Sequence, residues 1–217
     1  MLPSPIAVVE AFVKEFPILM KHSVVTLGEA FLGLILGIAL GFVFAVLMDQ
    51  FEPLHKAFYP LIVLSQTIPT VAIAPLLVLW FGYEMTPKVI LIMITTFFPI
   101  AVGLFNGFQS ADNDSMNLLR AMGARRWQIF CYIKYPSALS QFFAGIRIAT
   151  SYAVVGAVIS EWLGGFSGLG VYMTRVKQAF AFDKMFAVIF LISMISLILM
   201  KGVDILQKVS MPWEKEN

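Results

Sequence analysis

The amino-acid sequence predicts an all-α protein that crosses a membrane several times. The chain has 217 residues, of which 59% are hydrophobic and only 13% are charged. Soluble domains are about one-quarter charged, and a soluble core of this size has no room for so many apolar side chains. The net charge of +2 provides no strongly basic surface, so we expect no nucleic-acid partner.

Five apolar segments are long enough to cross a membrane, because a spanning helix needs about 20 mostly apolar residues. They are residues 24–48, 59–81, 89–108, 138–163 and 185–203. Residues 1–21 contain Pro3, Pro5 and Pro17 together with charged side chains, so we expect no sixth span there. They also lack the basic start and the cleavage site of a secretory signal. We therefore expect a single transmembrane domain over residues 1–217.

The first and second segments each carry a feature beyond their hydrophobicity. Gly33, Gly37 and Gly41 are four residues apart and share one helix face, where small residues allow close helix packing in lipid. We favour packing inside the chain over a contact between subunits. In the second segment, polar residues surround Pro69 and Pro75, whose missing N–H groups kink a helix. These polar side chains either repair the kink locally or line a path through the membrane.

Polar and charged side chains within the segments are candidates for function. For a translocation path the candidates are Gln66, which ranks first, with Thr67, Thr70 and Ser151. Ionisable residues inside a membrane are costly and often functional. Nevertheless, we expect Glu29 and Glu161 to reach the membrane interface, and Arg147 to extend to the cytoplasmic surface.

The connection between the third and fourth segments, residues 109–136, sets the predicted orientation. Lys and Arg concentrate on the cytoplasmic side of membrane proteins, and this connection carries four basic residues: Arg120, Arg125, Arg126 and Lys134. We therefore expect a multi-pass protein of the cell membrane, with this connection and the C-terminus in the cytoplasm.

The same connection, residues 109–136, is predicted to be helical. An acidic or hydroxyl side chain at residues 112–115 can cap a first helix, and Gly123 can end it in the left-handed region. A second amphipathic piece follows at residues 124–134, and we expect Pro136 to stop it where the fourth segment begins. Composition alone leaves two interpretations, a helix lying on lipid headgroups or a docking element for a cytoplasmic partner.

Three residues of this connection carry a family resemblance. Gly123, Ile133 and Pro136 stand at intervals similar to those in the cytoplasmic loop of ATP-binding-cassette (ABC) importer permeases. The sequence departs from that signature where Asn117, Leu118 and Leu119 replace Glu-Ala-Ala, which removes one ionic contact to the ATPase that the pattern implies. The resemblance implies an ATPase-coupling helix formed by Asn117, Leu118, Leu119, Ala121, Gly123, Ala124, Arg125, Arg126, Trp127, Ile133 and Pro136.

The resemblance extends over nearly the whole chain. Residues 65–82, 97–108 and 159–173 look like spans and an outer loop of the sulfonate, taurine, nitrate and pyrimidine branch of these permeases. Residues 182–204 look most like relatives for hydroxymethylpyrimidine and related thiamine precursors. The opening residues 2–9 resemble a segment that follows an extra N-terminal span in many relatives, so we expect that span to be missing or the start to be assigned late.

What this resemblance implies is the pore subunit of an ATP-driven importer of the type I class. It would pair with a second permease copy, two cytoplasmic ABC ATPase subunits and an extracytoplasmic substrate-binding protein. The implied cargo is a small organic solute, with a thiamine-pathway pyrimidine favoured over a sulfonate, taurine, nitrate or riboflavin. ATP and Mg²⁺ would be bound by the partner ATPase, so we expect no cofactor in this chain.

The residues themselves predict neither a catalytic nor a metal site. A phosphate loop ending in Gly-Lys-Ser or Gly-Lys-Thr is absent, and the two histidines and the single cysteine form no metal-ligand pattern. We therefore expect a protein that is not an enzyme. The alternative is a secondary transporter driven by an ion gradient, which would need an ion or proton site at mid-membrane. No Asp or Glu lies at the middle of a predicted segment.

Overall fold

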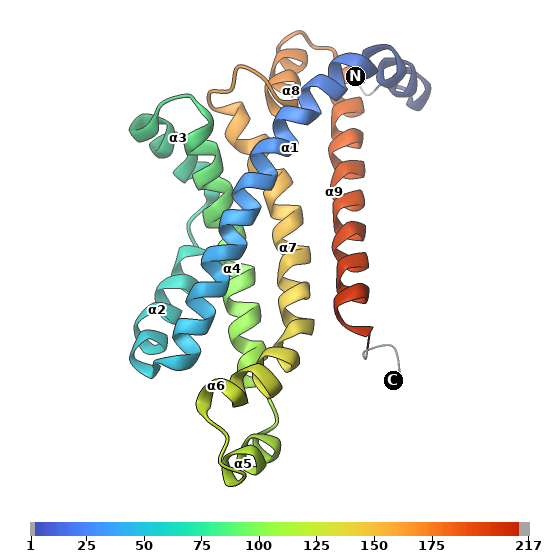
Figure 1. Cartoon of the computed structure of the whole chain (residues 1–217). Helices are drawn as coiled ribbons and strands as arrows, with labels where there is room; N and C mark the ends of the chain where they lie inside the picture. Colours follow the sequence, from blue (N-terminus) through green and yellow to red (C-terminus); the bar gives the residue numbers. More distant parts are fainter. Residues whose placement is uncertain (1–2, 213–217) are drawn as a thin grey trace.

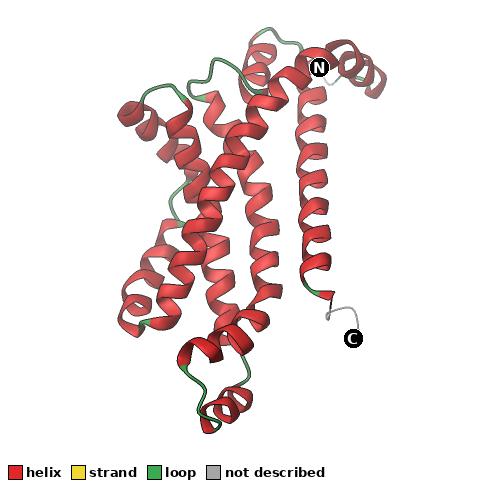
Figure 2. Ribbon diagram, in the orientation of Figure 1, coloured by secondary structure: helices red, strands yellow, loops and turns green. Residues whose placement is uncertain are grey.

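The computed structural model describes residues 3–212, and this part of the chain consists of helices joined by short loops, without strands (Figure 2). The longest helices are α1 (Pro5–Gln50), α4 (Met85–Gln109), α7 (Tyr135–Trp162) and α9 (Phe182–Ser210). Figure 1 shows α4, α7 and α9 along one axis, with α1 crossing them obliquely. Within residues 3–212, four helices are long and apolar enough to span a membrane, and a fifth span is present if α2 (Glu52–Ser65) and α3 (Thr70–Phe81) count as one. The predicted all-α, polytopic architecture is confirmed.

The first helix extends far beyond its predicted apolar segment. Ser4 caps it by accepting a hydrogen bond from the N–H of Ala7 at 3.2 Å. Pro5 is the first residue of the helix. A backbone N–H at this position has no acceptor inside the helix, so proline can occupy it without loss of a hydrogen bond. The first turns of α1 lie across the end of α9 (Figure 1), and there Leu19 is buried against α8 (Leu169–Gln178) and α9. Residues 5–23 therefore continue α1 and add no separate span.

The second predicted span is two helices, α2 (Glu52–Ser65) and α3 (Thr70–Phe81), bent by 99° at their junction. The expectation of one kinked helix over residues 59–81 is therefore wrong. Pro69 lacks an N–H and disfavours a helical conformation at the residue before it, so the chain leaves the helix at residues 66–69. Pro75 lies within α3 without ending it.

The three glycines of the first segment face α4. A methyl group built on Gly33, Gly37 or Gly41 would overlap Ile92, Thr96 or Ile100 respectively. This close approach of two backbones is what small residues allow in lipid, where packing rather than the hydrophobic effect holds helices together. The glycine face therefore packs inside the chain.

Replacing Gly37 with alanine should separate α1 from α4, because the new methyl group would overlap the side chain of Thr96. Overpacking of this kind costs about 1–3 kcal/mol. The measurement is the thermal stability of the purified chain in detergent. Gly28→Ala, on the same helix, is the matched control, since a methyl group there meets nothing within 4 Å. Equal stability of the two variants would contradict this account of the α1–α4 contact.

Candidate functional site

Residues 109–136 form a helical element that projects from one end of the bundle (Figure 1). We call it the projecting element, and we call the opposite end of the bundle the far end. It contains α5 (Asn113–Ala121), α6 (Arg126–Ile129) and a π-helical turn (Phe130–Lys134) that leads into α7. The C-terminal end of α9 lies at the same end of the bundle, while the N-terminal turns of α1 lie at the far end.

Local hydrogen bonds fix both ends of α5. Asp112 accepts from the backbone N–H groups of Asp114 and Ser115, at 3.3 and 3.0 Å, and from the Ser115 hydroxyl. These bonds, led by the one from the hydroxyl, lower the pKa of Asp112 below its usual value. At the other end Gly123 has a φ of +81°, and its N–H donates to the carbonyl of Arg120. The predicted cap and the predicted left-handed glycine are both confirmed.

The projecting element is firmly attached to the bundle. Lys134 Nζ lies 2.6 Å from Oδ1 of Asp49, whose side chain is only 1% exposed at the end of α1. Inside the element Met116 and Ile129 are buried against each other, and the ring of Trp127 stacks on Phe130. An element held by an ion pair and its own apolar cluster can transmit force as a unit.

Helix α7 begins at Tyr135 with Pro136 in its first turn, so Pro136 does not stop the amphipathic piece as predicted. The π-helical turn directly before it explains the difference. In that turn the N–H of Tyr135 donates five residues back, to Phe130, which widens the turn before the proline ring. Residues 126–162 therefore form one long helical segment.

The predicted coupling residues fall into two groups. Leu119, Ala124, Ile133 and Pro136 are half-buried and support the element. The exposed group includes two large apolar side chains, since Leu118 is 63% and Trp127 69% exposed. The other exposed members are Asn117, Ala121, Gly123, Arg125 and Arg126.

Two further apolar side chains of the projecting element were missed in the sequence. Met122 is 74% and Tyr132 is 73% exposed. Both belong to helical turns whose outward face becomes evident only once the positions of α5 and the π-helical turn are known. A surface of this kind is typical of a site that contacts another protein.

A cavity of about 310 Å³ opens where the second span is broken. Gln66 and Thr70 line it from the break, together with Thr95 of α4 and Tyr152 of α7. The remaining lining residues are Ile68, Pro69, Val155, Gly156 and Ile159. Every lining side chain is uncharged, so the cavity suits a neutral solute with hydrogen-bonding groups.

Two of the four predicted path residues lie outside the lining of this cavity. The hydroxyl of Thr67 donates to the carbonyl of Leu64 at 2.8 Å, which repairs the helix end locally. Ser151 is half-buried on α7. Thr95 and Tyr152 were missed in the sequence, because only the break between α2 and α3 brings them beside Gln66.

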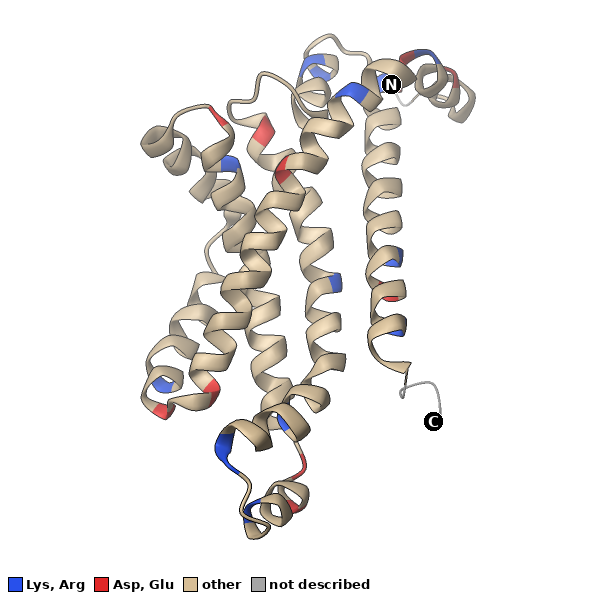
Figure 3. Ribbon diagram, viewed as in Figure 1, with Lys and Arg blue, Asp and Glu red and all other residues tan. Residues whose placement is uncertain are grey.

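Figure 3 shows most charged residues toward the two ends of the bundle, with a few along α7 and α9 between them. Glu29 and Glu161 are only 3% and 1% exposed, so the expectation that they reach the membrane interface is wrong. Glu29 pairs instead with Lys88 of α4 at 2.6 Å, and Glu161 accepts from the Thr26 hydroxyl at 2.7 Å. Burial is tolerated because each carboxyl group finds a donor on a neighbouring helix.

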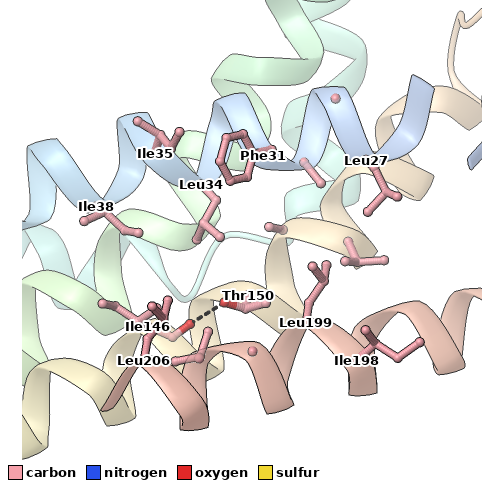
Figure 4. Close-up of a pocket in the computed structure, with 16 residues that line it drawn as sticks. Leu27, Phe31, Leu34, Ile35, Ile38, Ile146, Thr150, Ile198, Leu199 and Leu206 are labelled. Carbon is pink, nitrogen blue, oxygen red and sulfur yellow. Dashed lines mark hydrogen bonds between the residues drawn. The ribbon is translucent and has the colours of Figure 1, made fainter. Parts of the chain in front are cut away.

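Arg147 joins α7 to α9. Its Nε lies 2.7 Å from Asp204 Oδ1 and its Nη2 lies 2.9 Å from Gln207 Oε1. The expected extension to the membrane surface is replaced by this ion pair. Beside it, α1, α7 and α9 enclose a groove of about 800 Å³ that is lined almost entirely by apolar side chains (Figure 4). The hydroxyl of Thr150 in this groove donates to Ile146 of its own helix.

Tyr172 ties the N-terminal turns of α1 to α8 at the far end. Its hydroxyl lies 3.2 Å from Glu15 Oε2, and Lys184 of α9 pairs with the other oxygen of the same carboxylate. Burial, followed by the neighbouring charge of Glu15, raises the pKa of Tyr172 to about 12. The phenol therefore stays protonated and donates at neutral pH.

A bundle of helices long enough to span a membrane, with a projecting helical element and an uncharged cavity at a broken span, is the arrangement expected of a membrane transport subunit. The chain belongs to the family of binding-protein-dependent transport system inner membrane components, whose model matches residues 33–214. It is accordingly a multi-pass membrane protein and the permease component of an ABC importer.

Individual relatives agree with this assignment. The chain is 38% identical to the formylaminopyrimidine transport permease protein ThiX of Halalkalibacterium halodurans, over 100% of this chain and 87% of that protein. It is 31% identical to the riboflavin transport system permease protein RibX of Chloroflexus aurantiacus, over 98% and 80% of the two chains. The fold matches a chain of the MetNI methionine ABC transporter in an inward-facing conformation, with a TM-score of 0.78, 17% identity and coverage of 90% and 97%.

Proposed function

We propose that this chain couples ATP binding in a partner ATPase to solute import, through the projecting element. The observation that carries the proposal is the attachment of this element. The element is linked to the end of α1 by the Lys134–Asp49 ion pair, and from Arg126 onward it forms one continuous helical segment with α7. A displacement of the element would therefore move both helices.

The proposed cycle follows from this linkage. ATP and Mg²⁺ bind to two cytoplasmic ABC ATPase subunits, whose closure draws together the projecting elements of this chain and of a second permease copy. The helices then pass from an inward-open to an outward-open arrangement. They act as a two-state element whose equilibrium is shifted by a ligand bound elsewhere, here the ATP on the ATPase subunits. In this proposal the projecting element and the C-terminus are cytoplasmic, and the far end receives the extracytoplasmic binding protein.

The proposed cargo is a pyrimidine of the thiamine-precursor class. The formylaminopyrimidine permease named above supports this choice, and so does the neutral lining of the cavity at the broken span. The amide of Gln66 offers both a donor and an acceptor, as an aminopyrimidine ring requires, and Tyr152 offers an aromatic surface. A sulfonate or nitrate would instead favour a cationic side chain, and the lining has none.

Replacing Gln66 with leucine tests this assignment. The leucine side chain cannot form the one or two hydrogen bonds that we expect the amide to make to the solute, which are worth about 1–3 kcal/mol. We therefore expect formylaminopyrimidine uptake to fall about tenfold to a hundredfold in proteoliposomes that contain the ATPase and the binding protein. Thr67→Ala is the control, because that hydroxyl is used by the local carbonyl of Leu64. Unchanged uptake kinetics for Gln66→Leu would remove Gln66 from the path.

A further inference from the structure

A buried cluster of charged side chains joins α1, α4 and α7 at the far end. Its members Glu29, Lys88 and Glu161 are 3%, 7% and 1% exposed. Lys88 Nζ lies 2.6 Å from Glu29 Oε1, and Glu161 is close enough to Glu29 for the two carboxyl groups to interact electrostatically. The cluster therefore places two carboxyl groups and one ammonium group away from solvent.

The two carboxyl groups differ in how well they are satisfied. Both oxygens of Glu161 accept hydrogen bonds, Oε1 from the hydroxyl of Thr26 and Oε2 from the backbone N–H of Gly170. Glu29 accepts from Lys88 through Oε1, but its Oε2 is buried and has no hydrogen-bond partner among the described residues. A buried oxygen without a donor is unfavourable, and in native proteins it points to a missing group.

The charges point to the same missing group. Two carboxylates and one ammonium leave one net negative charge in a region of low dielectric constant, which is costly. Two carboxylates also cannot donate to each other, whereas a protonated carboxyl group has one O–H donor. A metal ion fits less well, because the Lys88 ammonium already holds the cationic position, and residues 3–212 contain no group of three His, Cys, Asp or Glu suited to a metal.

We propose that Glu29 and Glu161 together bind one proton, taken from water, between Glu29 Oε2 and the carboxylate of Glu161. The cluster is then neutral, and every oxygen in it has a donor. The site belongs to the pair, since two interacting carboxyl groups share their titration. The inference does not depend on the proposed transport cycle, and neither carboxyl group lines the cavity at the broken span.

The proton site lies beside the anchors of the loop that precedes α8. The N–H of Gly168 donates to Nδ1 of His22 at 3.0 Å, and the N–H of Leu169 donates to Thr26 Oγ1 at 2.9 Å. On the side of the cluster that faces the loop, the titratable and charged groups are His22 and its neighbour Arg175 of α8. Loss of the proton would leave the cluster with one net negative charge beside this loop. The attachment of the loop to α1 and α7 should then weaken.

Infrared spectroscopy of the full chain in lipid bilayers tests the proposal, because a protonated carboxylic acid has a carbonyl band separate from the carboxylate and amide bands. We expect this band at neutral pH, and we expect its loss in both Glu29→Gln and Glu161→Gln. Glu52→Gln, which alters an exposed carboxylate paired with Lys56, should keep the band. A native chain without the band, or a band that survives in both single variants, would overturn the proposal.

The pH dependence of thermal stability gives a second measurement. A proton held by the folded chain and released on unfolding makes the folded-to-unfolded ratio fall as the pH rises, by at most about tenfold per pH unit, until the folded pair also releases it. Glu29→Gln carries a permanent donor at this position and should lose that part of the dependence. Glu52→Gln should keep it. Equal pH profiles for the native chain and Glu29→Gln would contradict the proton site.

Discussion

Replacing Gly123 with proline is expected to abolish ATP-driven transport while the helices remain inserted in the membrane. Gly123 has a φ of +81°, which proline cannot adopt, and its N–H donates to Arg120. Losing the left-handed turn and this hydrogen bond costs about 3 kcal/mol or more. This corresponds to a roughly hundredfold smaller fraction of chains in which the projecting element keeps its native shape. The measurement is solute uptake per ATP hydrolysed in proteoliposomes with the complete transporter.

Gly123→Asn is the matched control for that substitution. Asparagine tolerates the left-handed region better than other residues with a side chain, and a Cβ at Gly123 meets nothing within 4 Å. We therefore expect coupled transport close to that of the native chain. Coupling that persists in Gly123→Pro would show that the shape of the projecting element is not needed for transport.

Replacing Lys88 with methionine is expected to produce the largest loss of stability. Lys88 and Glu29 form an ion pair whose side chains are only 8% and 4% exposed. Removing one partner leaves a buried carboxyl group without its cation, which typically costs about 3–5 kcal/mol. We expect the purified chain to melt at a clearly lower temperature and to accumulate at a reduced level in the membrane.

An ion pair of the same type on the surface provides the comparison. Lys56 and Glu52 are four residues apart on α2, with side chains 73% and 76% exposed. Exposed pairs of this kind contribute little, so Lys56→Met should leave the melting temperature unchanged. If Lys88→Met is as stable as Lys56→Met, the far-end cluster does not hold α1 to α4.

The architecture was largely predictable because it depends on local features of the sequence. The apolar segments, the helix cap at Asp112 and the left-handed conformation of Gly123 each depend on residues that are close together in the sequence. The angle of the broken span was not predictable, because Pro69 indicates a break without fixing its direction. The continuation of α7 through Pro136 depended on a π-helical turn that has no clear sequence signal.

The candidate sites were predictable only in part. Gln66 and Thr70 are polar residues in an apolar segment and stand out on composition alone. Thr95 and Tyr152 become part of the same cavity only through the packing of α4 and α7 against the break. Glu29 and Glu161 were assigned to the membrane interface, since the sequence does not show that Lys88 and Thr26 provide buried donors for them.

Purification of the native complex in mild detergent, followed by mass spectrometry, tests whether the projecting element binds an ATPase. We expect an ABC ATPase to co-purify with this chain, to be lost with Gly123→Pro and to be retained with Gly123→Asn. The same chain should move solute in liposomes only with that ATPase and ATP. A chain that purifies alone and transports solute under an ion gradient would rule out the importer function, and the projecting element would then be an interfacial helix.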